Sequence, residues 1–196
     1  GSPAGWGPAA SGRADTMGGQ PGGAQAVGQA SHAQASDPLA YGGRSRTAFV
    51  LTTSDRSAAG TRPDASGAAP GTRLVALGFR VERRVVADDR AVIAAAIVDA
   101  AARHRLVVTT GGTGLTPRDV TPQATADVLD YTVPGIAEAI RAEGRRSTPF
   151  AVLSRGLVGV RGGSLVVNVP GSPKGAMESF AVVETVLDHA LETLAG

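Results

Sequence analysis

Short apolar runs alternate with longer runs of helical spacing along the chain from residue 47 onward. Residues 47–53 (TAFVLTT) and 106–110 (LVVTT) are rich in β-branched side chains and are bounded by polar residues, which predicts two buried strands. Residues 79–87 alternate apolar and charged side chains, as is typical of a strand nearer the edge of a sheet. The last two predicted strands are residues 149–160 and 164–170, joined by a hairpin turn at Arg161-Gly162-Gly163.

Helical spacing fills the segments between these strands. The strongest helix is predicted over residues 88–104, where apolar side chains recur every three or four positions and Asp88 stands at the N-cap. Residues 67–78 predict another helix, which Gly78 ends, whereas residues 54–66 have the composition of a polar loop.

Three more helices are predicted in the second half of the chain. Thr121 and Pro122 provide an N-cap and a first helical position for a helix that runs to about residue 131. The other two are residues 134–144, which Gly144 ends, and a long helix from near Pro173 to Ala195. Strands that alternate with helices indicate an α/β sandwich with a mostly parallel sheet, and the late hairpin indicates one antiparallel edge.

The first 45 residues differ in composition from the rest of the chain. They hold eleven Gly and ten Ala, and only Val27 and Leu39 among Val, Leu, Ile and Phe. So little apolar surface cannot offset the entropy lost on ordering, which predicts a disordered tail over residues 1–45 and one domain over residues 46–196. The tail lacks the apolar run of a secretory signal, and no stretch approaches the ~20 apolar residues that span a membrane. We therefore expect a cytoplasmic protein without membrane contact.

Charge and residue usage narrow the chemistry that the chain can perform. Cysteine is absent, which removes disulfides and thiolate metal sites, and the three histidines are scattered along the sequence. The formal net charge is +2 and no concentrated basic stripe is present, so nucleic acid is not an expected partner. The only lysine is Lys174, in the first turn of the last predicted helix, where the helix dipole disfavours a cation. Either an anion binds beside Lys174 or it is a solvated surface residue.

Three predicted strand ends are unusually rich in glycine, hydroxyl and charged residues. They are residues 52–67, 109–122 and 168–175. Ligands of open α/β sheets bind at the carboxyl ends of strands, and free N–H groups at helix starts favour phosphate. The GGTG of residues 111–114 matches neither a P-loop nor the GxGxxG fingerprint, so by itself it is as consistent with a tight turn as with a phosphate loop. Asp88 and Asp119 are likewise either residues of helix starts or acids of a site.

These segments, taken together and in order, resemble the Mog/MoaB family of molybdenum-cofactor biosynthesis proteins. The resemblance covers about residues 47–195 and is most specific in TTGGTGLTPRDVTPQAT (residues 109–125). It extends to TSDRSAAGT (53–61), PGIAEAIR (134–141) and LSRGLVGVRGGSLVVNVPGSPKG (153–175). The resemblance implies a three-layer α/β/α sandwich, usually a homotrimer, that binds molybdopterin. For Mog members it also implies Mg²⁺-dependent transfer of AMP from ATP to the terminal phosphate of molybdopterin, release of pyrophosphate, and contact with a downstream molybdenum-inserting enzyme.

The resemblance assigns roles to residues at the three polar strand ends. Asp119, in RDVTP, and Asp88, in VADDR, correspond to the two catalytic acids, although the family often has Pro-Asp where this chain has Ala87-Asp88, and Asp89 competes for the second role. Mg²⁺ is typically held by one or two carboxylates together with substrate phosphates, a task that suits Asp88 and Asp119. The residues expected to bind phosphate, pterin or nucleotide are Ser54, Asp55, Arg56, Gly111, Gly112, Thr113, Gly114, Asn168, Gly171, Ser172 and Lys174.

This chemistry needs no activated side-chain nucleophile. The attacking group would be a substrate phosphate that is already ionised at neutral pH, so the protein has to supply positioning and relief of charge repulsion. That requirement agrees with a chain that has no cysteine and no visible triad. Two alternatives stay open: a MoaB-type paralogue with the same fold and weak or no adenylylation, and a pterin-binding or carrier module without catalysis.

Overall fold

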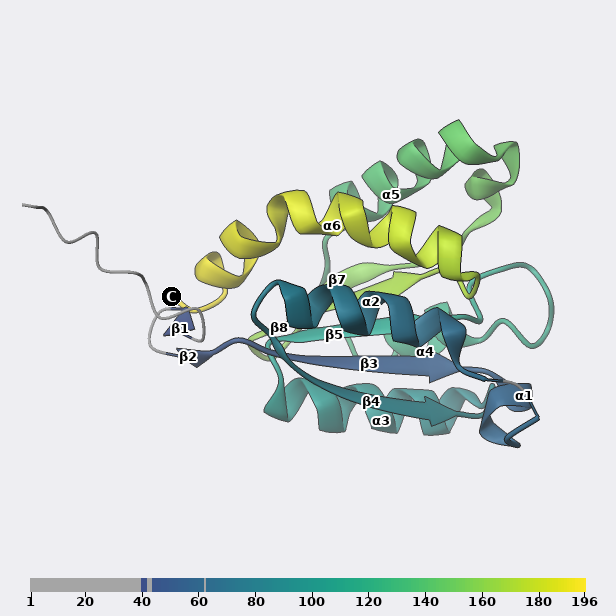
Figure 1. The fold of residues 1–196 in the computed structure, drawn as a ribbon, viewed down its shortest axis with the longest axis horizontal. Coiled ribbons are helices and arrows are strands. Elements are labelled where there is room, and N and C mark those ends of the chain that lie inside the picture. The colour runs from purple at the N-terminus through teal and green to yellow at the C-terminus, as the bar shows by residue number, and fades with distance from the viewer. Residues whose placement is uncertain (1–39, 42–43, 62) are drawn as a thin grey trace, which may run out of the picture. The chain divides into compact units, whose positions relative to one another are not determined.

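A six-stranded mixed sheet lies at the centre of the computed structural model, which describes residues 40–41, 44–61 and 63–196. The strand order is β4-β3-β5-β8-β7-β6; the first four strands are parallel, and β8–β7 and β7–β6 are antiparallel pairs (Figure 1). The strands are β3 (Thr47–Thr53), β4 (Arg80–Val86), β5 (Leu106–Thr110), β6 (Tyr131–Thr132), β7 (Val158–Arg161) and β8 (Ser164–Val169). The prediction of a mostly parallel sheet with an antiparallel edge is confirmed.

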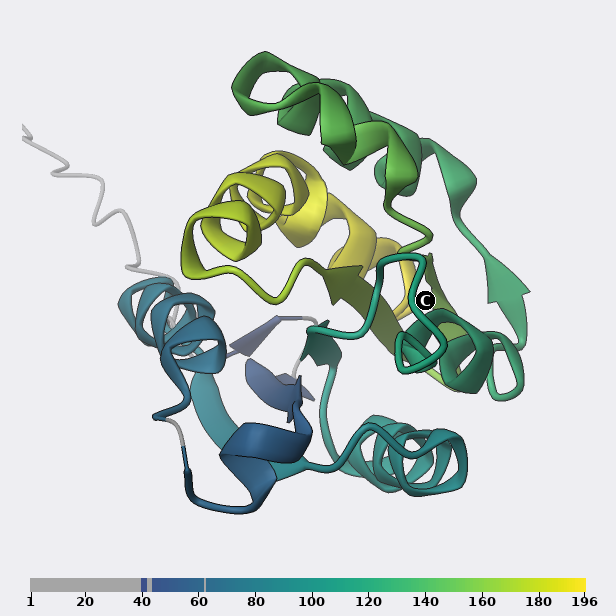
Figure 2. The same ribbon diagram turned by 90° about the vertical axis from the view of Figure 1, so that its right-hand side faces the viewer.

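Helices cover both faces of this sheet and complete a three-layer α/β/α sandwich (Figure 2). One face carries α2 (Ala65–Ala76), α5 (Pro134–Ser147) and α6 (Pro173–Thr193). The other face carries α3 (Arg90–Arg103) and α4 (Thr121–Ala126). A short helix, α1 (Asp55–Ala58), follows β3, and a 3-10 helix, η1 (Pro149–Leu153), follows α5.

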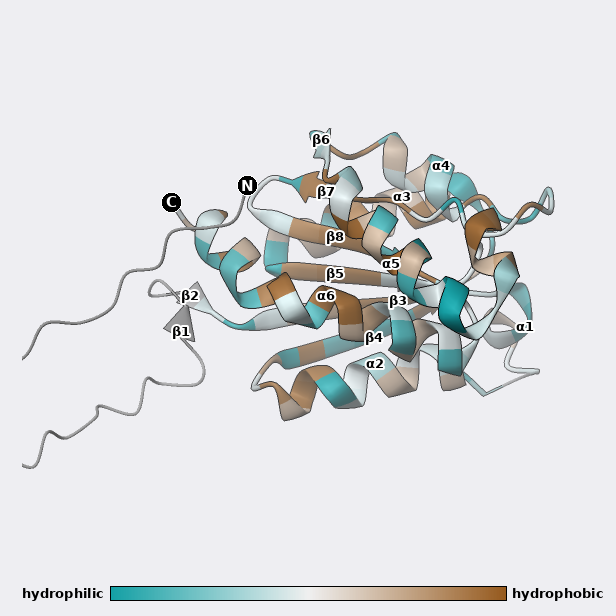
Figure 3. Ribbon diagram, turned by 90° about the horizontal axis from the view of Figure 1, so that it is seen from above, coloured by the Kyte–Doolittle hydropathy of each residue, from teal (hydrophilic) through white to brown (hydrophobic). Residues whose placement is uncertain are grey.

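The central strands are buried on both faces, which explains why β3, β5 and β8 have nearly continuous apolar sequences (Figure 3). Alternate side chains of one strand enter opposite layers. Ala48 and Val50 pack on the side of α2 and α6, and Phe49 and Leu51 pack on the side of α3. β4 lies at the edge and is largely exposed, as its alternating sequence predicts.

Two helix starts differ from their predictions. Asp89, not Asp88, caps α3, and its Oδ1 accepts a main-chain hydrogen bond at 2.9 Å. Val120, not Thr121, is the N-cap of α4, which has no side-chain cap. Thr121 is buried inside the helix instead, with its hydroxyl oxygen 3.1 Å from that of Thr53. Both differences place a polar side chain at the end of the sheet rather than at a helix cap.

The loop between β3 and β4 is partly helical. α1 occupies part of the predicted polar loop and is capped by Ser54. α2 begins at Ala65, two residues before its predicted start, because Asp64 caps it by accepting a hydrogen bond from Gly67 N at 2.8 Å. α4 ends at Ala126 rather than near residue 131, where the chain forms β6 instead.

The chain between α5 and β7 departs most from its prediction. Gly144 lies inside α5 instead of ending it, and a Cβ there would lie 2.9 Å from the Cβ of Ala151. Residues 149–160 are predicted as one strand, but only residues 158–161, at its end, are extended. Pro149 opens the 3-10 helix, because its ring fixes φ near the helical value and it has no N–H to donate to a sheet.

Most of the tail predicted over residues 1–45 lies outside the described residues. Its described end forms β1 (Ala40–Tyr41) and β2 (Arg44–Ser45), which pair antiparallel in a two-stranded sheet. Among the helices of the described residues, none combines the length and apolar character needed to cross a membrane.

Candidate active site

The polar loops predicted to bind a ligand meet at one edge of the sheet. β3, β5 and β8 are neighbours, so their carboxyl ends at Thr53, Thr110 and Val169 lie side by side (Figure 2). The glycine turns after β5 and β8 also touch. Gly111 N donates to Val169 O at 3.2 Å, and a Cβ on Gly171 would lie 3.0 Å from Gly111 Cα. Segments far apart in the sequence therefore form one continuous surface.

A cleft of about 220 Å³, which we call the two-aspartate cleft, opens at this edge. It is lined by both predicted acids, Asp88 and Asp119, and by Gly111 and Gly112 of the GGTG loop. Its other lining residues are Thr53, Ser54, Arg56, Ser57, Pro63, Ala65, Ser66, Arg118, Gly171 and Pro173. Hydroxyls, guanidinium groups and glycine turns around two carboxylates suit a phosphate that is accompanied by a metal ion.

Asp88 is held by a reciprocal pair of hydrogen bonds with Asp55. Asp55 N donates to Asp88 Oδ2 at 3.1 Å, and Asp88 N donates to Asp55 Oδ1 at 3.0 Å. Burial raises the pKa of Asp88 above its ordinary value, and the carboxylates of Asp55 and Asp119 raise it further, against the opposing effect of its hydrogen bonds. Because Asp89 caps α3, the structure places Asp88 rather than Asp89 in the cleft.

Asp119 is surrounded by hydrogen-bond donors. Its Oδ2 accepts bonds from Thr116 N at 2.8 Å and from Thr116 Oγ1 at 2.7 Å. Burial by itself would raise the pKa of Asp119, but these bonds, another from the Gly114 N–H and the charge of Arg155 outweigh burial and hold the pKa below its ordinary value. Asp119 is therefore a preformed anion in the cleft.

The first two residues of GGTG need to be glycine. Gly111 has a φ of +99°, and a Cβ there would lie 2.5 Å from the main-chain oxygen of Thr53. Gly112 has a φ of +61°, and its Cβ would lie 2.4 Å from Thr121 Oγ1 and 3.1 Å from Thr53 Oγ1. Left-handed backbone and close approach both exclude a side chain at these positions.

Only part of GGTG is available as a phosphate cradle. The Gly111 N–H is used by Val169 O, and the Gly114 N–H is used by the Asp119 carboxylate. Within the described part of the chain, the N–H groups of Gly112 and Thr113 have no hydrogen-bond acceptor of their own. These two N–H groups could donate hydrogen bonds to a phosphate oxygen without breaking a hydrogen bond of the protein.

A second hollow, of about 400 Å³, adjoins the other half of the GGTG loop. Thr113 and Gly114 line it, so one loop lines the two-aspartate cleft with its first two residues and this hollow with its last two. Its apolar wall consists of Leu115, Ile140, Phe150, Ala151, Leu153 and Pro170. Its polar residues are Arg141, Thr148, Ser154, Ser172, Glu178 and Ser179. This hollow, the apolar pocket, has the character of a site for a largely apolar group with a few polar atoms.

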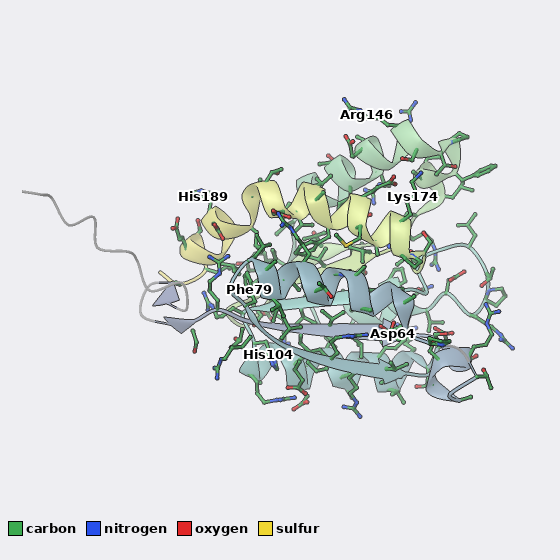
Figure 4. All side chains as sticks on the ribbon, viewed as in Figure 1. Asp64, Phe79, His104, Arg146, Lys174 and His189 are labelled. Atoms are coloured by element: carbon green, nitrogen blue, oxygen red, sulfur yellow. The ribbon has the colours of Figure 1, made fainter. Side chains whose placement is uncertain are left out.

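Three of the predicted ligand-binding residues, Asp55, Asn168 and Lys174, line neither hollow. Asn168 is buried, and its Nδ2 donates to Thr109 Oγ1 at 2.8 Å and to Thr125 Oγ1 at 2.9 Å. It links β8 to β5 and α4. Lys174 is exposed at the start of α6, with Nζ 3.7 Å from Glu178 Oε1 (Figure 4). A lysine beside an acid of its own helix needs no bound anion to explain it.

The remaining predicted ligands lie at or beside the hollows. Ser54, Arg56 and Gly171 line the two-aspartate cleft, and Ser172 lines the apolar pocket while also capping α6. Asp55 lines neither hollow and acts through its hydrogen bonds with Asp88.

Asp64 and Ser66 also belong to this edge, although neither is among the predicted site residues. Besides capping α2, Asp64 accepts a hydrogen bond from Thr52 Oγ1 at 2.9 Å and pairs with Arg83 Nη2 at 2.7 Å (Figure 4). Burial raises the pKa of Asp64, but its hydrogen-bond partners and the Arg83 charge outweigh burial and hold the pKa below its ordinary value. Thr110 Oγ1 donates to Ser66 Oγ at 3.1 Å, which fixes Ser66 at the cleft. The signal that could reveal them is the aspartate before small residues in DASG, a helix-start pattern.

Arg118 is a further cleft residue outside the predicted set, although it directly precedes Asp119 in the RDVTP motif. Its side chain is 79% exposed, and Nη1 lies 3.5 Å from Asp55 Oδ2. Together with Arg56 it adds positive charge to a cleft that also holds two carboxylates. The cleft can therefore interact with a cation and with an anion at the same time.

The donor set fits Mg²⁺ that is bound together with a phosphate. No three His, Asp or Glu side chains of the described residues gather closely enough to hold a metal ion by themselves. The charge of Asp119 nevertheless raises the pKa of Asp88, a repulsion that a shared cation would relieve. Since Mg²⁺ usually takes one or two carboxylates and completes its shell with phosphate oxygens and water, Asp88 and Asp119 are sufficient protein ligands.

The fold and the site define a three-layer α/β domain that presents paired carboxylates and glycine turns at the carboxyl edge of its sheet. The profile of the MoCF_biosynth family, described as a probable molybdopterin binding domain, matches residues 49–189. This chain belongs to that family, and the predicted resemblance to Mog and MoaB proteins is confirmed.

Curated relatives include both short and long proteins. The molybdopterin adenylyltransferase of Helicobacter pylori (strain J99) is 36% identical over 154 residues, which cover 75% of this chain and 86% of that protein. The molybdenum cofactor biosynthesis bifunctional protein of Synechococcus elongatus is 41% identical over 151 residues, 76% of this chain and 47% of that protein. The molybdenum cofactor synthesis protein cinnamon of Drosophila melanogaster is 43% identical over 90 residues, 46% of this chain and 15% of that protein. The chain thus spans about half, or less, of these two longer relatives.

Solved structures of both branches of the family share the fold. The molybdopterin biosynthesis Mog protein from Mycobacterium ulcerans has a TM-score of 0.74 and 41% identity, covering 76% of this chain and 99% of that chain. The molybdopterin biosynthesis enzyme MoaB from Thermus thermophilus has a TM-score of 0.70 and 46% identity, covering 76% of this chain and 96% of that chain. Overall likeness therefore does not separate a Mog-type from a MoaB-type protein.

Proposed function

We propose that this chain is a molybdopterin adenylyltransferase, which transfers AMP from ATP to the terminal phosphate of molybdopterin and releases pyrophosphate. The observation that carries the proposal is the GGTG loop, which lines two adjoining hollows of different character. One hollow has paired aspartates and glycine turns, as a phosphate requires, and the other has an apolar wall that suits a ring system. The adenylyltransferase of H. pylori, most of whose length this chain matches, supports the proposal.

In this proposal the two-aspartate cleft holds the reacting phosphates. The N–H groups of Gly112 and Thr113 bind phosphate oxygens, and the guanidinium groups of Arg56 and Arg118 offset their charge. Because the attacking phosphate is already ionised, no side chain has to remove a proton from it. The contribution of the chain is to align two anionic substrates and to reduce the repulsion between them.

Asp88 and Asp119 are the residues that would hold Mg²⁺ in this cleft. When bound, Mg²⁺ supplies positive charge to the phosphates at the point of transfer. Asp119, whose pKa lies below its ordinary value, is charged before any ligand binds. Asp88, whose pKa is raised by burial and by neighbouring carboxylates, is the acid whose charge is least favourable in the ligand-free protein.

The direct test is to incubate the purified chain with molybdopterin, Mg²⁺ and ATP labelled at the α-phosphate. We expect the label in the pterin product, with one pyrophosphate released per labelled pterin. A parallel reaction with a chelator in place of Mg²⁺ should give neither product. Retention of unlabelled molybdopterin, with ATP left intact, would contradict the enzymatic assignment.

A MoaB-type paralogue is the second candidate, because the chain is about as similar to the MoaB protein of T. thermophilus as to the Mog protein of M. ulcerans. Such a protein would keep the apolar pocket and the GGTG loop but show weak or no adenylylation. The labelling experiment separates the two candidates, since only the adenylyltransferase transfers the α-phosphate.

The proposal includes a homotrimer, which exposed apolar side chains support. Phe150, Val152 and Leu153 of η1 are 73%, 54% and 46% exposed, and nearby Leu115 is 63% exposed. Side chains of this kind, gathered in one region, are typical of a surface that another protein covers. Val152→Asp should therefore shift the chain from trimer to monomer in light scattering. Val75→Asp, at a position 60% exposed on α2, is the control and should leave the trimer intact. An unchanged mass for Val152→Asp would place the subunit contact elsewhere.

Contact with a downstream molybdenum-inserting enzyme is the last part of the proposal. In S. elongatus the matching segment belongs to a bifunctional protein about twice as long, which supports a close relation between consecutive steps. The test of this contact is whether the chain and such an enzyme elute together in size-exclusion chromatography in the presence of the adenylylated product.

A further inference from the structure

Arg155 joins two parts of the chain that are far apart in sequence. It lies in the loop between η1 and β7 and makes three hydrogen bonds to the loop after β5. Its main-chain N donates to Thr113 O at 2.9 Å, and its Nε donates to Gly114 O at 2.7 Å. Its Nη2 donates to the main-chain oxygen of Asp119. The half-buried guanidinium therefore spans the loop from one end to the other.

The loop between these contacts is otherwise closed on itself. Asp119 Oδ2 accepts hydrogen bonds from Thr116, and a Cβ on Gly114 would lie 3.0 Å from the same oxygen. Within the described residues, the hydrogen bonds that tie the main chain of residues 113–119 to other parts of the protein all come from Arg155. Without Arg155 the distance between GGTG and the Asp119 carboxylate would depend on the loop alone.

The acceptors explain why this residue is an arginine. All three acceptors are main-chain oxygens; one accepts from the main-chain N–H of Arg155 and two accept from its guanidinium. A planar guanidinium offers several donors in fixed directions, so it can serve two separate carbonyls at once. A lysine ammonium carries the same charge but cannot reach two separate carbonyls with the same geometry. The arrangement thus depends on the shape of the group as well as on its charge.

We propose that Arg155 is a positioning residue for the reaction: it fixes the Asp119 carboxylate relative to the GGTG turn without touching substrate. The expected effect on turnover rests on the proposed function. The expected effect on the order of the loop rests on the loop geometry alone. A displacement of a reacting group by about 1 Å can lower turnover about 100-fold. The loss should therefore appear in kcat, because the substrates still bind through the hollows themselves.

The test compares Arg155→Lys with the parent chain by amide hydrogen exchange and by kinetics. We expect the hydrogen-bonded amides of Gly114, Thr116 and Asp119 to exchange at least ~10-fold faster, while those of β5 stay unchanged. We expect kcat to fall about 100-fold, with KM for ATP and for molybdopterin changed less than about 3-fold. Arg161→Lys is the matched control: Arg161 Nη1 lies 3.3 Å from Asp130 Oδ1, outside both hollows, and neither quantity should move.

A double variant separates positioning from a general structural role. If Arg155 acts through Asp119, then adding Arg155→Lys to Asp119→Asn should lower kcat by less than about 3-fold further. Additive losses, normal turnover of Arg155→Lys, or unchanged exchange of the Gly114, Thr116 and Asp119 amides would each overturn the inference. Amide exchange requires no turnover, so a parent chain that does not adenylylate would refute the proposed function while the exchange result still decides the role of Arg155.

Discussion

Asp119→Asn is expected to lower adenylylation turnover by about 10²- to 10³-fold while molybdopterin remains bound. Holding Mg²⁺ against the phosphates contributes several kcal/mol at the transition state, and each ~1.4 kcal/mol lost is tenfold in rate. Asparagine is nearly isosteric and can still accept a hydrogen bond from Thr116, so the loop should keep its shape. Pterin affinity and pyrophosphate release should be measured side by side on this variant.

The outcome of that comparison assigns Asp119. Lost turnover with retained pterin is the result expected of a metal ligand. Normal turnover would refute the metal role, and lost pterin binding would place Asp119 in the pterin site instead.

The companion variant Asp88→Asn should lose turnover as well but should gain stability at neutral pH. The pKa of Asp88 is raised in the folded protein, so the folded state binds its proton more tightly than the unfolded chain does. Its contribution to stability is therefore lost as pH rises from the ordinary aspartate value through the folded pKa. Asparagine removes that loss, so the Tm of Asp88→Asn should exceed the Tm of the parent at pH 7 and not at pH 3. The pKa of Asp119 is shifted the other way, so Asp119→Asn should show no such gain.

Gly112→Ala is expected to lower both the stability of the fold and the affinity for phosphate-bearing substrates. A φ of +61° disfavours any side chain by roughly 1–2 kcal/mol, and a Cβ only 2.4 Å from Thr121 Oγ1 adds overpacking of about 1–3 kcal/mol. For a chain of this size each kcal/mol corresponds to about 2–4 °C in Tm. The methyl group would also separate the Thr53 and Thr121 hydroxyls, so phosphate-bearing substrates should bind more weakly.

Gly162→Ala is the matched control for this prediction. Gly162 has nearly the same φ, +59°, but an added Cβ has no atom within 4 Å and lies outside both hollows. It should show the backbone strain alone, without loss of substrate binding. Equal Tm losses for the two variants would mean that the GGTG turn can shift to accommodate the added methyl group. Unchanged substrate binding by Gly112→Ala would mean that GGTG is only a structural turn.

The sheet could be predicted from the sequence because its central strands are buried on both faces. The apolar runs at 47–53 and 106–110 indicate strands and not helices, since a helix of that length and composition would not bury nearly all of its side chains. The strand predicted over residues 149–160 was wrong for the opposite reason. The segment is apolar, but Pro149 and the packing of η1 against α5 determine its backbone conformation. None of residues 149–153 is buried, so an apolar run in the sequence does not by itself show that its side chains enter the core.

The site could be predicted only where a motif carries it. Asp119 stands in a specific motif, and it lines the cleft. Asp88 and Asp89 are adjacent and both suit a helix cap, and what places Asp88 in the cleft is a hydrogen-bond pair with Asp55, 33 residues away. Arg155 could not be selected at all, because its acceptors are main-chain oxygens that leave no mark in the sequence.

A loop that borders two hollows also couples them. A ligand in the apolar pocket would contact Thr113 and Gly114, which directly follow Gly111 and Gly112 of the adjoining cleft. If the proposed substrates occupy the two hollows, thermodynamic linkage requires any coupling through this loop to be reciprocal: the pterin changes the affinity for nucleotide by the same factor by which nucleotide changes the affinity for the pterin.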